Sequence, residues 1–177
     1  MRPRDLLMLL AVGCMAAELP REVRMPPIKG EYLTGRKANL PQDASGKVAL
    51  LALGFTYESR FAVEAWVKRF RADYGANPQA TFYEIPMIGG VAQIGRWFID
   101  SGMRRSTPKA DQERVITVYG DAKVWKKRVG YKAVDAAYLI LLDKSGVVRW
   151  RYSGVLDETA YKSLVAEVQP LLAESKK

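Results

Sequence analysis

The first half of the chain alternates between a strand pattern and a helical pattern. Lys47 to Phe55 is apolar at almost every position, which is typical of a central strand covered on both faces. Residues 58–74 repeat apolar side chains every three or four positions and so predict an amphipathic helix. Residues 81–85 favour β-structure and precede Pro86, so we expect a second strand that stops there. The apolar face of the helix comprises Phe61, Ala62, Ala65, Trp66 and Phe70.

The second half predicts a helical insertion followed by four further elements. Residues 87–114 should form a helix, a turn and a short polar helix after Pro108. The later elements are a strand (115–119), a basic helix (122–132), an antiparallel hairpin (137–142 and 147–152) and a last helix (157–173). The apolar positions that predict the insertion helix are Val91, Ile94, Trp97, Phe98 and Met103.

This order of elements predicts an α/β domain over residues 47–174. Two parallel crossovers precede the hairpin, and a terminal helix packs back on the sheet. The expected architecture is thioredoxin-like: a central mixed sheet flanked by helices, with a helical insertion after the second core strand. Residues 18–46 are rich in proline, glycine and charge, so we expect an extended lead-in with a small hairpin at most.

The N-terminus predicts an export signal over residues 1–17. Arg2 and Arg4 precede an apolar run of eight residues, and small residues follow. Eight residues are too few to span a bilayer. Ala11 to Cys14 resembles a lipobox, in which the cysteine is acylated, and cleavage after Ala16 or Ala17 is the alternative. We expect a periplasmic or membrane-anchored protein, because the segment is short and serine-poor for a mitochondrial presequence.

Two residue types that carry much enzyme chemistry are almost missing. The chain has no histidine, and its one cysteine is Cys14. A Ser-His-Asp or Cys-His arrangement, imidazole metal ligands, internal disulfides and structural zinc are therefore excluded from the domain. We expect no cofactor and no metal, and an enzymatic role is the less favoured alternative.

The junction between the first predicted strand and helix is where thioredoxins and peroxiredoxins hold their nucleophile. Thr56 and Ser59 have the spacing of the peroxiredoxin Thr-x-x-Cys motif, with serine in place of cysteine. A serine without a neighbouring base is a poor nucleophile, and capping of the helix is the simpler interpretation. Residues 134–138 lack the proline that thioredoxins place before the hairpin strand. We expect a groove near Thr56, Ser59 and Tyr138 to bind an extended partner segment without thiol chemistry.

The chain is basic, with 28 Lys and Arg against 19 Asp and Glu and a formal charge of +9. This excess favours anionic surfaces such as lipid head groups or an acidic partner, although a solvated basic surface is an equal alternative. Nucleic acid is not an expected partner, because no known nucleic-acid module is visible. Each tryptophan could instead belong to the core, which we expect for Trp66. The candidate binding residues are Arg96, Trp97, Arg104, Arg105, Trp125, Lys126, Lys127, Arg128, Arg149, Trp150 and Arg151.

Two segments carry a further resemblance. One is the hairpin region, residues 137–164, with its Asp-x-x-Gly-x-x-Arg-Trp pattern followed by Ser-Gly. The other is the insertion with its following strand, residues 85–121. Both resemble the mitochondrial ATP synthase assembly factor family and its bacterial thioredoxin-like relatives. The resemblance implies a redox-inactive thioredoxin-like domain, and a role as chaperone of the membrane-embedded proton-channel subunit.

The functional hypothesis is an exported, non-catalytic binding or assembly factor at a membrane surface, with a protein partner. A thioredoxin- or peroxiredoxin-related oxidoreductase with an unidentified nucleophile is the alternative. A third interpretation is a structural domain recruited only through its helical insertion.

Overall fold

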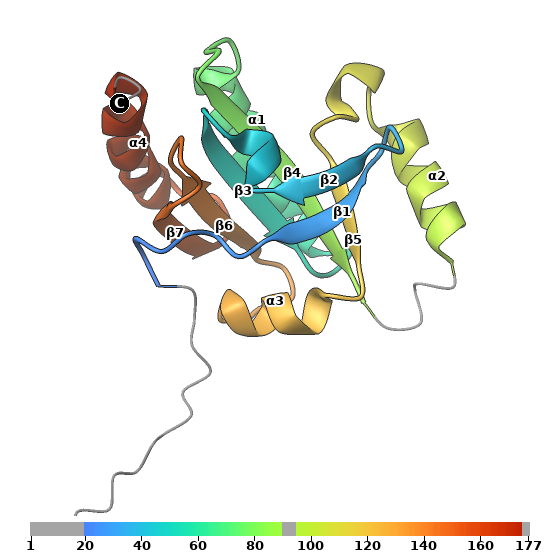
Figure 1. Ribbon diagram of the computed structural model, residues 1–177. Coiled ribbons are helices and arrows are strands. Elements are labelled where there is room, and N and C mark those ends of the chain that lie inside the picture. The colour runs from blue at the N-terminus through green and yellow to red at the C-terminus, as the bar shows by residue number, and fades with distance from the viewer. Residues whose placement is uncertain (1–19, 90–94, 175–177) are drawn as a thin grey trace, which may run out of the picture.

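The computed structural model describes residues 20–89 and 95–174, which form one mixed sheet with helices on both faces (Figure 1). The sheet has seven strands in the order β2-β1-β5-β4-β3-β6-β7. Strands β3, β4 and β5 are parallel, and their neighbours β1 and β6 run antiparallel to them. The strands are β1 (Ile28–Tyr32), β2 (Lys37–Leu40), β3 (Val48–Gly54), β4 (Ala80–Ile88), β5 (Ile116–Tyr119), β6 (Ala137–Leu142) and β7 (Val148–Gly154).

Two helices cover one face of the sheet and one covers the other. Helices α1 (Ser59–Tyr74) and α4 (Glu158–Ala173) share an apolar core with β3, and α3 (Ala122–Arg128) packs on the opposite face. Helix α2 (Arg96–Ser106) lies beside β1 and β5 (Figure 1). Residues 20–89 and 95–174 also contain two short 3₁₀ turns, Gln42–Ala44 and Lys109–Asp111. The predicted α/β architecture is therefore confirmed.

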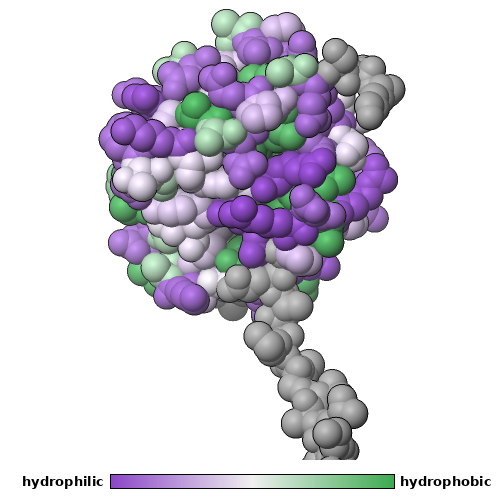
Figure 2. Space-filling model, turned by 90° about the vertical axis from the view of Figure 1, so that its left-hand side faces the viewer, coloured by the Kyte–Doolittle hydropathy of each residue, from purple (hydrophilic) through white to green (hydrophobic). Residues whose placement is uncertain are grey.

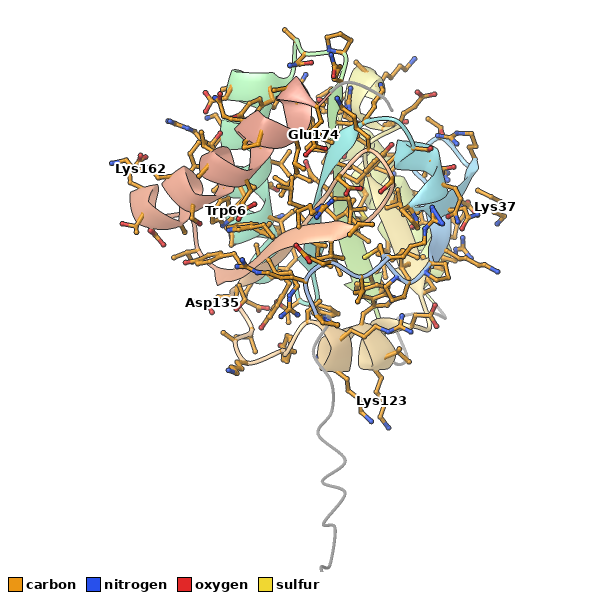
Figure 3. The ribbon with its side chains drawn as sticks, turned by 60° about the vertical axis from the view of Figure 1, so that its left-hand side comes forward. Lys37, Trp66, Lys123, Asp135, Lys162 and Glu174 are labelled. Carbon is orange, nitrogen blue, oxygen red and sulfur yellow. The ribbon has the colours of Figure 1, made fainter. Side chains whose placement is uncertain are left out.

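Strand β3 explains how an apolar run becomes a central strand. Val48, Leu50 and Ala52 belong to the core beneath α1 and α4, whereas Ala49, Leu51 and Leu53 belong to the core on the α3 face. Side chains alternate between the two faces of a strand, so one continuous run supplies both cores. Figure 3 shows Trp66 of α1 inside the molecule and Lys123 and Lys162 at its outside.

The lead-in contributes to the sheet itself. Strands β1 and β2 form a hairpin whose turn contains Gly35 at φ +89°, and β1 pairs with β5. Ile28, Tyr32 and Leu40 are buried in the core. The hairpin thus extends the sheet, and the apolar core begins well before residue 47. Cys14 and the predicted signal lie outside the described residues, as do Val91 and Ile94 of the insertion.

Two details of the expected elements are wrong. Strand β4 does not stop at Pro86: Met87 and Ile88 pair with Val118 and Tyr119 of β5 after β3 has ended. A proline removes one hydrogen-bond donor but keeps an extended backbone, so the strand continues with a new neighbour. Phe61 of α1 is exposed rather than part of the helix's apolar face.

Candidate functional site

Ser59 and Thr56 form a closed hydrogen-bonded joint between β3 and α1. The Ser59 hydroxyl accepts the backbone N–H groups of Phe55 (3.1 Å) and Thr56 (3.2 Å) and donates to the Thr56 carbonyl (2.9 Å). Thr56 Oγ1 accepts the Ser59 N–H (3.0 Å) and donates to the Val134 carbonyl. Ser59 is 1% exposed. Both hydroxyls are therefore occupied by structural bonds, and neither is available as a nucleophile.

Tyr138 organises the loop that faces this joint. Its hydroxyl accepts the N–H groups of Lys132 (2.9 Å) and Ala133 (3.0 Å) and donates to the Ala133 carbonyl (3.1 Å). Its buried ring stacks on Tyr131 at 5.5 Å and meets Phe55 edge-on at 5.4 Å. The prediction that Tyr138 lies near Thr56 and Ser59 is consistent with this arrangement, but its ring supports the loop from inside.

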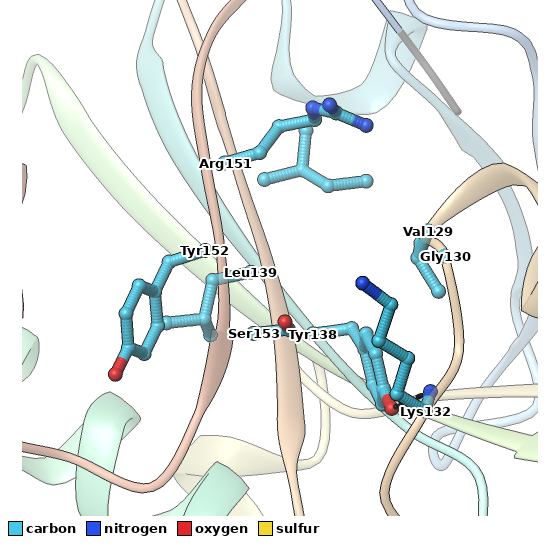
Figure 4. A pocket seen from close by; sticks show the side chains of 9 residues that line it. Val129, Gly130, Lys132, Tyr138, Leu139, Arg151, Tyr152 and Ser153 are labelled. Carbon is cyan, nitrogen blue, oxygen red and sulfur yellow. Dashed lines mark hydrogen bonds between the residues drawn. The ribbon is translucent and has the colours of Figure 1, made fainter. Parts of the chain in front are cut away.

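A cavity of about 230 Å³ is lined by Tyr138 and by residues of the loop that it supports (Figure 4). Lys132 and Arg151 extend toward it from the loop and from β7. Two cations at one cavity would suit an acidic side chain or another small anion. The remaining lining residues are Val129, Gly130, Leu139, Ile140, Tyr152 and Ser153.

Large apolar side chains are exposed at the end of the sheet where β3 and β7 finish and β6 begins. Tyr57, Phe61, Val134 and Val155 are 57% to 68% exposed. The guanidinium of Arg60 lies 4.1 Å from the Tyr57 ring centre and 4.5 Å from that of Phe61. We call these five residues the β3-end surface. The helical pattern assigned Phe61 to the core, and only the Tyr-x-x-Arg-Phe spacing could have indicated the cation between two rings.

The predicted basic and aromatic residues do not form one surface. Trp125 is buried in the core on the α3 face and Trp150 in the core beneath α1 and α4, so neither ring can contact a partner. Their prediction as binding residues was wrong, because α3 and β7 pack with these rings in the two cores. Trp150 Nε1 also donates to Ser163 Oγ at 3.1 Å. Figure 2 shows hydrophilic residues over most of the surface that carries α4, with apolar ones scattered among them.

The Asp-x-x-Gly-x-x-Arg-Trp pattern has a structural role. Asp143 Oδ1 accepts the N–H groups of Ser145 (2.8 Å) and Val147 (3.0 Å), and Oδ2 pairs with Arg149 Nε (2.8 Å). Burial tends to raise the pKa of Asp143, but these hydrogen bonds outweigh it and lower the pKa. A Cβ on Gly146 would approach Pro41 to 2.9 Å. Arg149, predicted to bind a partner, instead closes the hairpin.

The basic residues of α3 are divided between the core aromatics and solvent. Lys126 Nζ lies 4.2 Å from the Tyr131 ring centre, and the Arg128 guanidinium lies 4.8 Å from that of Trp125. Lys127 is exposed. Cation–π contacts of this kind fix a side chain without removing its charge from the surface. Lys126 therefore lies beside the aromatic cluster next to the Thr56–Ser59 joint.

Helix α2 separates its predicted binding residues into two groups. Arg96 pairs with Glu31 (2.9 Å), and Arg104 Nε donates to the Leu33 carbonyl (2.6 Å), so both hold the helix to β1. Trp97 and Arg105 point away and are exposed. The described residues contain no cluster of three metal-ligating side chains, and no helix among them is long and apolar enough to cross a membrane.

Comparison with known proteins agrees with this description. A putative thiol:disulfide interchange protein, DsbE, of Chlorobium tepidum is 17% identical, with a TM-score of 0.59 over 88% of this chain and 99% of that one. A putative protein disulfide isomerase of Bacteroides thetaiotaomicron is 15% identical, with a TM-score of 0.61 over 88% of this chain and 92% of that one. BsSco, a member of the Sco family of cytochrome c oxidase assembly proteins, is 13% identical, with a TM-score of 0.59 over 90% of this chain and 99% of that one. These similarities show a thioredoxin-like fold.

No match was found among curated proteins. Residues 21–171 match the family described as ATP10 protein. The matched segment includes the insertion, the hairpin and the Asp143 turn, on which the resemblance to the ATP synthase assembly factors rested. The family match and the solved structures confirm that resemblance, and the active-site cysteine pair of the thiol–disulfide relatives is absent. The chain belongs to the ATP10 protein family and has the thioredoxin-like fold without its thiols.

Proposed function

We propose that this protein is a thiol-free assembly factor that binds an extended segment of a partner protein at the β3-end surface. Family membership supports the assembly role, and the family resemblance implies a membrane-embedded subunit of ATP synthase as the partner. The similarity to BsSco supports the use of this fold by assembly proteins.

One contrast carries the proposal. The position of the usual nucleophile is occupied by the buried Ser59, whose hydroxyl has three structural hydrogen bonds. The apolar side chains around that position remain exposed, Tyr57 and Phe61 foremost. Exposed aromatic rings beside an arginine are typical of binding hot spots. Exposed apolar side chains around a position that lacks a reactive group favour a binding protein over an enzyme.

The proposed location is the extracytoplasmic side of a membrane. The charged, apolar and small residues of positions 1–17 support export, and Cys14 would be the attachment point of a lipid anchor. Mass spectrometry of the mature protein tests this directly. An acylated N-terminal Cys14, or a chain that begins just after Ala16 or Ala17, is expected. An intact Met1 would contradict the proposal on location.

Assembly can be tested in cells that lack the protein. We expect less assembled ATP synthase on native gels, and restoration by the wild type. The double variant Tyr57→Ser and Phe61→Ser should not restore assembly, because it removes the two exposed rings without touching the core. The control variant Lys162→Ala, exposed on α4, should restore it. Full restoration by the double variant would exclude the β3-end surface as the binding site.

The oxidoreductase alternative makes a different prediction. A thioredoxin-related enzyme reduces insulin disulfides or consumes peroxide through a thiolate. The mature domain offers no cysteine, and Ser59 and Thr56 are occupied. We therefore expect no turnover in either assay, and thiol-dependent turnover above the background rate would refute the proposal.

A further inference from the structure

Helix α2 turns its aromatic side away from the protein. Asp100 is its buried residue, whereas Trp97 is 69% and Phe98 74% exposed. The two rings meet edge-on, with 4.9 Å between their centres. An amphipathic helix of a globular domain normally turns its apolar residues to the core. In α2 the two aromatic rings face solvent instead, so the pair is available for contact with another molecule or surface.

Polar contacts hold the helix in this orientation. The Tyr119 hydroxyl donates to Asp100 Oδ1 at 2.7 Å, and Arg96 bridges Asp100 and Glu31. The hydrogen bond from Lys37, with the charges of Arg96 and Arg104, lowers the pKa of Glu31. The ion pairs and hydrogen bonds therefore occupy the inward side of α2, and the rings are displayed on its outward side.

The segment that carries the two rings is rich in basic residues. Residues 96–110 contain the cations Arg96, Arg104, Arg105 and Lys109 and a single acid, Asp100, which is buried. Arg105 and Lys109 are exposed. The exposed residues of this segment thus combine aromatic rings with positive charge, and the acid that follows the segment, Asp111, is paired with Arg71 at 2.8 Å. Trp97 and Phe98 lie in the first turn of α2, Arg105 in its last turn and Lys109 in the 3₁₀ turn that follows. We call these four residues together the α2 outer face.

We propose that the α2 outer face binds the surface of an anionic lipid bilayer. Trp97 and Phe98 would enter the boundary between head groups and acyl chains, and Arg105 and Lys109 would lie on lipid phosphates. Tryptophan is favoured at that boundary because its ring is large and apolar with one polar N–H, and basic residues are attracted to anionic head groups. This inference rests on the membrane location proposed above and specifies the surface that makes the contact.

Tryptophan fluorescence is a built-in reporter for this contact. Trp66, Trp125 and Trp150 are at most 3% exposed, so Trp97 is the tryptophan whose surroundings a membrane would change. The experiment uses the chain with Cys14→Ser, which cannot be acylated there, and vesicles of phosphatidylglycerol or phosphatidylcholine. With phosphatidylglycerol vesicles, we expect the emission of Trp97 to shift to shorter wavelength and the protein to float with the vesicles. High salt should abolish both effects. Phosphatidylcholine vesicles should produce neither the emission shift nor flotation.

Variants identify the residues responsible. Replacing both Arg105 and Lys109 by alanine should weaken binding by roughly 10- to 30-fold, at about fivefold per cation. Trp97→Phe should keep most binding but abolish the shift, and Trp97→Ser with Phe98→Ser should reduce flotation at least tenfold. Val124→Ser, which removes an exposed apolar side chain from α3, is the matched control and should change nothing. Unchanged thermal unfolding would show that each variant folds.

The outcomes separate this inference from the proposal on which it rests. If the protein floats with anionic vesicles and the Trp97/Phe98 double variant floats equally well, the α2 assignment is overturned while a membrane location stands. If the Cys14→Ser chain does not float with either lipid, the lipid assignment of α2 is overturned, whereas the proposed location is judged separately by mass spectrometry of the N-terminus. If Trp97 emission shifts on addition of a purified partner protein but not of vesicles, α2 is a protein-docking helix and the lipid assignment is wrong.

Discussion

Ser59 and Thr56 hydrogen-bond to each other in both directions. The backbone N–H of Ser59 donates to Thr56 Oγ1, and the Ser59 hydroxyl donates to the Thr56 carbonyl. Ser59→Ala leaves the partly buried N–H groups of Phe55 and Thr56 without this acceptor. We expect a loss of about 1–2 kcal/mol in the free energy of unfolding, measured by urea denaturation. A loss no larger than that of Ser106→Ala, on an exposed residue, would contradict the structural role.

Asp143 is expected to stabilise the hairpin through its charge. Asp143→Asn should lower the free energy of unfolding by about 2–3 kcal/mol at neutral pH, because it weakens the pair with Arg149 and the turn bonds. The pKa of Asp143 is lower in the folded protein than in the unfolded chain. Its contribution to the free energy of unfolding is therefore fully present above the unfolded pKa and is lost as pH falls through the folded pKa. Denaturation at pH 7 and pH 3 checks this, and the variant's deficit should shrink at pH 3.

A control separates the two ion pairs of Arg149. Its second partner, Glu22, lies 3.7 Å away, and the Glu22 side chain is 79% exposed. Glu22→Gln should therefore change stability by less than about 0.5 kcal/mol. Equal effects of the two substitutions would indicate that the turn bonds of Asp143 contribute nothing.

Glu84 should give the free energy of unfolding a pH dependence opposite to that of Asp143. Its burial in β4, and then the charges of Glu64 and Asp111, raise its pKa from 4.5 to about 7. The folded protein then retains a proton that the unfolded chain releases, so this residue makes stability fall as pH rises from about 4.5 to about 7. Glu84→Gln should gain on the order of 1–2 kcal/mol at pH 8 and nothing at pH 4. Equal gains at both pH values would refute the assignment.

Gly30 is expected to accept no side chain. A Cβ there would lie 2.6 Å from the Thr117 carbonyl oxygen and 2.7 Å from Ile116 Cγ2, both on β5. Gly30→Ala must push β1 away from β5, and we expect a loss of about 1–3 kcal/mol by thermal or urea unfolding. Gly102→Ala, in α2 with no atom within 4 Å of its added Cβ, should instead stabilise by about 0.5–1 kcal/mol.

Local patterns predicted most of the elements. The apolar run of β3, the period of α1 and the turn between β6 and β7 each depend on neighbouring residues, and each is present in the structure. Asp157 is the N-cap of α4, as expected, and accepts the N–H of Ala160. The sequence predicted a small hairpin at most for residues 18–46 and not its place in the sheet, because the pairing of β1 with β5 joins segments far apart in the sequence.

The candidate site was harder to predict, since exposure depends on tertiary packing. Trp97 and Trp125 both lie on short helices rich in basic residues, yet one ring is exposed and the other buried. The difference arises because α3 packs on the sheet, whereas α2 meets β1 and β5 through Asp100 and Arg96. No pattern within either helix encodes that choice.

The double role of β3 has a consequence for cooperativity. Its alternate side chains anchor the layers on both faces, with Leu50 on one and Leu51 on the other. Neither layer can melt while the other persists, because both would lose the same strand. Unfolding should therefore follow a single two-state transition. A partner protein would then encounter either the folded domain or the unfolded chain, because no partly folded state is populated.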